Sequence, residues 1–279
     1  MIKPKLEFVE SLVTRPCNLA CTGCSTFSDL EHKGYSRWEN EKDFIEAWAN
    51  RLDIQAWGVM GGEPLMNPYL KDWVTGIREL LPDAQIRIVT NGILLERHWD
   101  LVELLSEIGN CILKITVHID DDRINNVINK IKASWNWQPV YEFGIHRWKI
   151  DNDFKFQITH PDVYYKTFVG EYENMRPHNN DPVNAFSVCS QQRCPMIYKG
   201  KLYKCGTAAL TQEILERFNK PNWDKWEPYL NKGLDINCSD LELQQFSDNF
   251  GKPHQICRQC PTNKDIGSII PHKINVKFK

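Results

Sequence analysis

The feature that most constrains the fold is an order of short apolar strands and amphipathic helices, repeated through the first 160 residues. Apolar or alternating runs predict strands at 6–14, 54–60, 85–90, 112–119, 140–148 and 154–159. Apolar residues at helical spacing predict helices at 41–52, 69–81, 99–108 and 123–135. Strand followed by helix, repeated, is typical of a parallel α/β sheet or barrel.

Composition excludes several classes of protein. A hydrophobic share of 42% supports a core, and a formal net charge of -2 without a long basic run argues against nucleic-acid or membrane partners. No apolar stretch approaches the roughly 20 residues that span a bilayer. The charged start of the chain does not resemble a signal peptide, so we expect a cytoplasmic protein. Ten cysteines in a cytoplasmic protein indicate metal or redox chemistry rather than disulfides.

The chain is predicted to divide into two domains. The strand–helix order is lost after about residue 160, and residues 170–190 are rich in Asn, Pro and charge, as linkers are. Six of the ten cysteines then lie between Cys189 and the end of the chain. We therefore expect an α/β domain over residues 1–170, and a linker with a small Cys-rich domain over 171–279. Three aspartates at 120–122 are expected to cap the following helix rather than bind metal.

Three cysteines follow the first strand on one loop, with three and then two residues between them: Cys17, Cys21 and Cys24. The carboxyl ends of strands are where parallel barrels build active sites. Cysteines this close in sequence can direct their thiolates toward one shared metal centre, as in iron–sulfur proteins. Three ligands on a four-iron cluster would leave one iron open to a chelating small molecule. A zinc loop completed by a distant Cys or His is the alternative.

A glycine-rich turn ends the second strand, with the order Gly61, Gly62, Glu63, Pro64. Two glycines let a ligand approach the main chain closely, and a carboxylate can pair with an ammonium group. Next to an open iron, such a carboxylate suits a ligand that carries an amino acid group.

These motifs, together with Thr90-Asn91-Gly92 at the end of the third strand, resemble the radical S-adenosylmethionine enzymes over roughly residues 5–160. The resemblance implies a partial (βα)6 TIM-like barrel. It implies that Cys17, Cys21 and Cys24 hold a [4Fe-4S] cluster whose fourth iron binds S-adenosylmethionine, with Gly61–Glu63 on its amino group. Reductive cleavage would yield a 5′-deoxyadenosyl radical that abstracts a substrate hydrogen. Gly23 stands where the family usually has an aromatic residue against adenine.

A polar barrel interior is predicted from the alternation of side chains along the strands. In the fourth strand, Lys114, Thr116 and His118 share the face opposite the apolar residues. Thr116, His118 and Asn91 are candidate contacts of S-adenosylmethionine. Other side chains expected in the interior are Arg87, Glu142, His146, Lys155, Gln157 and Thr159. A polar interior favours a polar substrate; His146 and Arg147 either contact it or form a structural pair.

Five of the six C-terminal cysteines are candidates for a second metal site: Cys189, Cys194, Cys205, Cys257 and Cys260. A hairpin turning at Gly200 and the closely spaced last pair predict a closed four-Cys site, either structural zinc or iron–sulfur. The sequence resembles the short "twitch" form of the SPASM domain, which implies an auxiliary [4Fe-4S] cluster. Either Cys189 or Cys194 would then complete the set. Cys111 and Cys238 are expected to be ordinary thiols.

The predicted function is a radical enzyme acting on a polar substrate, with the auxiliary cluster assisting oxidation. A peptide or protein side chain is the first candidate substrate and a sugar-like metabolite the second. The first strand begins at about Leu6, so no leader-binding domain is expected before it. An electron donor such as flavodoxin or ferredoxin is implied. The rival interpretation is a non-enzymatic iron–sulfur or zinc protein.

Overall fold

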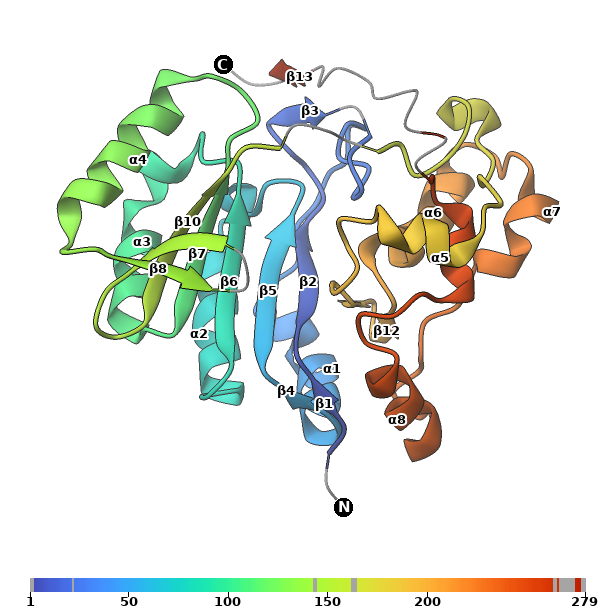
Figure 1. Cartoon of the computed structure of the whole chain (residues 1–279), viewed down its shortest axis with the longest axis horizontal. Coiled ribbons are helices and arrows are strands. Elements are labelled where there is room, and N and C mark those ends of the chain that lie inside the picture. Colours follow the sequence, from blue (N-terminus) through green and yellow to red (C-terminus); the bar gives the residue numbers. More distant parts are fainter. Residues whose placement is uncertain are drawn as a thin grey trace.

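A computed structural model describes residues 3–21, 23–142, 145–161, 165–262 and 265, and the main chain of 274–276. Its centre is an open nine-stranded sheet in the order β12-β11-β2-β5-β6-β7-β10-β9-β8 (Figure 1). The strands are β2 Val9–Thr14, β5 Ala56–Gly61, β6 Gln85–Thr90, β7 Cys111–Thr116, β8 Gln138–Glu142, β9 Ile145–Lys149, β10 Phe154–Thr159, β11 Met196–Tyr198 and β12 Lys201–Tyr203. The predicted mixed α/β fold with a largely parallel sheet is confirmed.

Four helices connect the parallel strands, as predicted: α1 Trp38–Arg51, α2 Leu70–Leu80, α3 Trp99–Ile108 and α4 Asp122–Ser134. Asp121 caps α4 by accepting the main-chain N–H of Arg123 at 2.9 Å, so the acidic run has the capping role expected of it. Pairs from β11 through β10 are all parallel. Their carboxyl ends therefore meet at one edge of the sheet.

The described residues contain six mutually parallel strands, β11, β2, β5, β6, β7 and β10, and five of them are followed by an α-helix before the next parallel strand in the chain. The predicted single strand over 140–148 is wrong. It is a hairpin in which β8 and β9 pair antiparallel, with Val140 opposite Arg147 and Tyr141 opposite His146. Side-chain alternation continues across the two strands of a hairpin, so periodicity alone does not show where the chain reverses.

Aromatic residues fill the layer between the sheet and its helices. Trp48, Trp57 and Trp73 are each at most 2% exposed and belong to one core with Ile88 and Ile115. Burial of such side chains stabilises the fold by roughly 1.5–3 kcal/mol each. These tryptophans therefore form core rather than a recognition surface.

The C-terminal part extends the same sheet. β11 pairs with β2, and the β11–β12 hairpin turns at Lys199-Gly200, as predicted. Residues 170–190, predicted as a linker, contain a 3-10 turn and the helix α5. The remaining elements, to the right in Figure 1, are α5 Pro182–Ser187, α6 Gly206–Arg217, α7 Trp223–Trp226 and α8 Asp240–Asp248.

Short elements complete the fold. Two-stranded sheets are formed by β1 Lys5–Leu6 with β4 Asp53–Ile54, and by β3 Leu19–Cys21 with β13 Ile274–Val276. The 3-10 turns are η1 Pro64–Met66, η2 Leu95–His98, η3 Tyr172–Asn174, η4 Glu227–Tyr229 and η5 Gln255–Gln259. β3 lies within the three-Cys loop, so the main chain of β13 runs beside that loop.

Candidate functional site

The three N-terminal cysteines lie on the loop that follows β2, at the carboxyl edge of the sheet. The Cys17 sulfur accepts the main-chain N–H of Leu19 at 3.4 Å, and the Cys24 sulfur lies 3.2 Å from the Thr26 hydroxyl. The side-chain amide of Asn91, at the end of β6, donates to the Asn18 side chain at 2.7 Å. Asn18 had no signal in the sequence beyond its place in the loop.

Glu63 fixes the ends of two strands to each other. Its side chain is 1% exposed and accepts three hydrogen bonds: from the Thr90 hydroxyl at 2.6 Å, and from the main-chain N–H groups of Asn91 at 2.8 Å and Leu65 at 3.1 Å. Burial raises the pKa of Glu63 to about 7, and these three donors oppose the rise. The carboxylate therefore shapes the turn, and its remaining acceptor capacity is what a ligand amino group can use.

The two glycines before Glu63 allow the Cys17 loop to sit directly on the turn. A Cβ atom at Gly62 would lie 2.2 Å from the Pro16 carbonyl oxygen, and one at Gly61 would lie 2.6 Å from the Thr14 carbonyl oxygen. The main-chain N–H of Glu63 donates to the Pro16 carbonyl at 2.9 Å. From the sequence, we expected a ligand to approach the main chain at these glycines. In the structure, the atoms that lie this close are main-chain atoms of the protein itself, at Thr14 and Pro16.

One cavity of about 200 Å³ collects the predicted N-terminal site. Among the residues in its wall are all three cysteines and all six candidate contacts of S-adenosylmethionine: Cys17, Cys21, Cys24, Gly61, Gly62, Glu63, Asn91, Thr116 and His118. They come from the loops after β2, β5, β6 and β7. The arrangement follows from parallel strands that end at the same edge.

The donor set fits an iron–sulfur cluster better than a single ion. In the described part of the chain, no three His, Cys, Asp or Glu side chains are close enough to hold one metal ion. A cubane binds each thiolate through a different iron, so its ligands need not meet at one point. Burial, and then the nearby Glu63 carboxylate, raise the pKa of the Cys17 thiol. A cationic cluster would offset that cost, because its irons favour the thiolate.

The C-terminal cysteines also gather. Burial raises the pKa of Cys189, Cys205, Cys257 and Cys260, and in each pair among these four thiols one member further raises the pKa of the other. The pKa of Cys194 is raised by burial and then by Glu10 on β2, ahead of Cys189 and Cys205. We call the four mutually close cysteines the C-terminal thiol set. All ten cysteines of the chain are free, and Cys111 is buried, as expected.

A second cavity, of about 300 Å³, lies between the two groups of cysteines. Its wall includes Cys189, Cys205 and Cys260 of the C-terminal thiol set, and it shares Ser25 and Thr116 with the first cavity. Lys114 and Thr159, from β7 and β10, form its wall on the sheet side. A molecule in this cavity would lie next to both candidate cofactor positions.

The predicted polar interior is present below this cavity. The Glu142 carboxylate pairs with Arg147 and with Lys155, each at 3.1 Å, and Arg147 donates to Gln157 at 3.1 Å. Arg147, Lys155 and Gln157 are at most 7% exposed. His146, predicted to face inward, is exposed and packs against Tyr141. The hairpin explains this error, since Arg147 takes the face that a continuous strand would give to His146.

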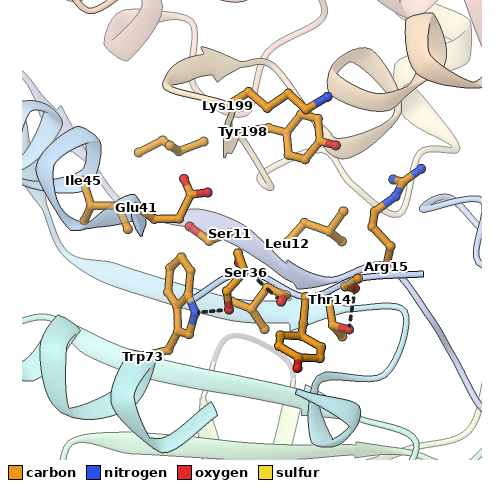
Figure 2. A pocket seen from close by; sticks show the side chains of 14 residues that line it. Ser11, Leu12, Thr14, Arg15, Ser36, Glu41, Ile45, Trp73, Tyr198 and Lys199 are labelled. Atoms are coloured by element: carbon orange, nitrogen blue, oxygen red, sulfur yellow. Dashed lines mark hydrogen bonds between the residues drawn. The ribbon is translucent and has the colours of Figure 1, made fainter. Parts of the chain in front are cut away.

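A third cavity, of about 260 Å³, is separate from the cysteines. It lies between β2 and α1, where Glu41, Tyr198 and Lys199 approach Ser11 and Leu12 (Figure 2). None of the cysteines is in its wall. The Trp73 indole donates to the Ser36 carbonyl at 3.1 Å on its floor. Among the described residues, it shares no wall residue with either of the other two cavities.

Comparison with known proteins gives a family match within the N-terminal half of the chain. Residues 11–139 match the Radical SAM superfamily. The GTP 3′,8-cyclase of Alkaliphilus oremlandii (strain OhILAs) is 29% identical over 119 residues, which are 42% of this chain and 35% of that protein. The GTP 3′,8-cyclase of Nautilia profundicola is 27% identical over 97 residues, or 34% and 30% of the two chains. The matched segment thus spans about a third of these relatives.

The fold as a whole resembles a solved structure. The crystal structure of BtrN in complex with AdoMet and 2-DOIA superimposes with a TM-score of 0.55 at 15% identity, over 94% of this chain and 95% of that one. This likeness concerns the fold. Within the described residues, no helix has the length and apolar character needed to cross a membrane.

Proposed function

We propose that this chain is a radical SAM enzyme that reductively cleaves S-adenosylmethionine and abstracts hydrogen from a polar substrate, a proposal supported by the match of residues 11–139 to the Radical SAM superfamily. The observation that carries the proposal is the single cavity that unites Cys17, Cys21 and Cys24 with Glu63 and Thr116. When bound by the three thiolates, a [4Fe-4S] cluster supplies the electron for this cleavage. Gly61, Gly62 and Glu63 would hold the amino group of the cofactor, and Asn91, Thr116 and His118 would line its other side.

The C-terminal thiol set is proposed to hold an auxiliary [4Fe-4S] cluster in a twitch-like domain. Its four cysteines lie close to one another, which supports Cys189 rather than Cys194 as the fourth ligand. Cys194 is directed toward the sheet interior, near Glu10 and Lys114. The cluster would accept an electron when the substrate is oxidised, so the proposed class is oxidoreductase. An external donor such as flavodoxin or ferredoxin would reduce the N-terminal cluster. Ten free thiols favour a cytoplasmic location.

Of the two substrate classes predicted from the sequence, the second cavity favours a small metabolite over a peptide or protein side chain. A volume of about 300 Å³ is at the lower end for small-molecule sites, and hydroxyl groups are frequent in its wall. The likeness to GTP 3′,8-cyclases covers only the N-terminal half of this chain, so it supports radical chemistry and not their substrate.

The test is anaerobic reconstitution with iron and sulfide, followed by dithionite and S-adenosylmethionine. We expect 5′-deoxyadenosine from the wild type and none from Cys17→Ala, Cys21→Ala or Cys24→Ala. A protein that binds zinc at these thiols, or that forms no 5′-deoxyadenosine, would refute the proposed function.

Iron content tests the auxiliary cluster. The wild type should bind about eight irons, Cys257→Ser about four, and Cys194→Ser about eight, since Cys194 lies outside the C-terminal thiol set. Equal loss of iron in both variants would show that Cys194 is a ligand.

A further inference from the structure

The cavity between the two groups of cysteines has one lysine in its wall and, among the described residues, no arginine or carboxylate. That lysine is Lys114, on β7. Its neighbours in the wall are neutral and polar: Ser25, Thr116, Thr159, Thr167, Gln191 and Thr207. Lys114 is therefore the only cationic side chain among the described residues of this wall.

Lys114 has no partner in the described part of the protein. No carboxylate lies within 4.0 Å of its ammonium group, and no acceptor there makes a hydrogen bond to it. An ammonium group has three donors and no acceptor, and leaving them unmet inside a protein is costly. Lys155, on the neighbouring strand, has carboxylate partners for its ammonium group: it pairs with Glu142 at 3.1 Å and with Asp153 at 3.4 Å.

The surroundings do not neutralise Lys114. Glu10, on β2, is 4% exposed, and burial raises its pKa to about 8, so this acid is mostly protonated at neutral pH. One of its carboxyl oxygens, Oε1, has no hydrogen-bond partner. Burial lowers the pKa of Lys114, Cys194 and Glu10 raise it, and Arg147 and Arg87 lower it. Among the described residues, the acids that act on Lys114 are thus a thiol and a largely protonated carboxyl group.

We propose that this cavity binds a small hydroxylated substrate with a carboxylate or phosphate group, and that Lys114 holds this anionic group. The inference rests on the proposed function, whose substrate class it specifies. An ammonium group donates only, so it selects an acceptor and disfavours a substrate amine. The hydroxyl and amide groups of the wall can hydrogen-bond the remaining hydroxyls.

The strand geometry gives Lys114 a positioning role. Lys114 and Thr116 lie on the same face of β7, two residues or about 7 Å apart along the strand. Thr116 belongs to both cavities, whereas Lys114 belongs only to the second. An anionic group held at Lys114 leaves the other end of a sugar-sized molecule at Thr116, next to the cofactor cavity.

Calorimetric titration of the anaerobically reconstituted protein tests this assignment. The probes are D-gluconate, D-glucose 6-phosphate, D-glucose and D-glucosamine, which compare two anions with a neutral and a cationic sugar. We expect at least one anion to bind about tenfold or more tightly than D-glucose, with D-glucosamine weakest. The stronger of the two anions identifies the group that Lys114 prefers.

Lys114→Gln and Lys114→Met should remove the preference for the anion, and Lys114→Arg should retain most of it. Lys252→Gln, which makes the same charge change at an exposed position, should bind like the wild type. Equal affinity for charged and neutral probes, no binding of either anion, or an unchanged preference in Lys114→Gln would overturn the assignment. Formation of 5′-deoxyadenosine by the same samples reports on the proposed function separately, because it needs no bound sugar.

Discussion

Replacing Glu10 gives the strongest test of the electrostatic interactions inside the sheet. Glu10 lies on β2 near Lys114 and Cys194, and one of its carboxyl oxygens has no hydrogen-bond partner. Burial raises its pKa from 4.5 to about 8, and the nearby Lys114 ammonium opposes that rise. The perturbation we consider is Glu10→Gln, which keeps the shape of the side chain and removes its ionisation.

The sign of the effect follows from proton binding. Between pH 4.5 and 8 the folded protein keeps the Glu10 proton while the unfolded chain loses it, so the free energy of unfolding falls as pH rises. One pKa unit corresponds to 1.36 kcal/mol. With these two pKa values the penalty on the wild type is about 1 kcal/mol at pH 5 and about 4 kcal/mol at pH 7.5. Glutamine carries no such penalty.

We therefore expect the stability of Glu10→Gln, relative to the wild type, to increase by about 3 kcal/mol between pH 5 and pH 7.5. Urea unfolding of the anaerobically reconstituted proteins, followed by tryptophan fluorescence at several pH values, measures it. Exposed Glu46→Gln is the matched control and should show no such trend. A difference between Glu10→Gln and wild type that does not change with pH would refute the reasoning, since the carboxyl group would then be ionised in the fold.

Three further predictions concern the edge of the sheet. Gly62→Ala puts a methyl group 2.2 Å from the Pro16 carbonyl, which should cost about 1–3 kcal/mol and at least half of the bound N-terminal iron; Lys252→Ala, at an exposed position, should keep its iron in the same assay. Thr90→Val removes the 2.6 Å bond to Glu63 and should lower the free energy of unfolding by about 1–3 kcal/mol in urea, more than Thr75→Val at a half-buried position, where the hydroxyl donates to main-chain carbonyls of its own helix. Arg147→Gln leaves Glu142 with Lys155 alone and should cost about 2 kcal/mol, measured in the same way.

Much of the fold could be predicted because its signals are local. β6, β10 and α3 have the predicted bounds, since each is a strongly patterned segment next to a turn or helix-ending residue. The hairpin of β8 and β9 could not, because alternation continues on both sides of a chain reversal. The three cysteines of the first loop could be proposed as one site from their spacing, since they lie in one short segment.

The C-terminal thiol set required the tertiary structure. Its cysteines come from three separate places in the chain, and spacing could not decide between Cys189 and Cys194. β11 settles their positions: it begins at Met196, which pairs with Glu10, and the Glu10 N–H donates to the Pro195 carbonyl at 2.9 Å. Pairing with β2 therefore carries Cys194 into the sheet interior. Cys189 instead follows α5, which packs against η5, the turn that carries Cys257.

The near-zero net charge of the sequence does not reveal that cationic side chains gather on one face of the sheet. A net charge of -2 suggests a chain without electrostatic preference, but most of its carboxylates are on the surface. On the concave face of the sheet, Arg87, Lys114, Arg147 and Lys155 face the carboxylate of Glu142 and a largely protonated Glu10. In a medium of low dielectric constant this imbalance acts at close range on whatever enters the cavity. Under the proposed assignment, this local excess of cations, and not the net charge of the chain, sets the preference of the site for an anionic substrate.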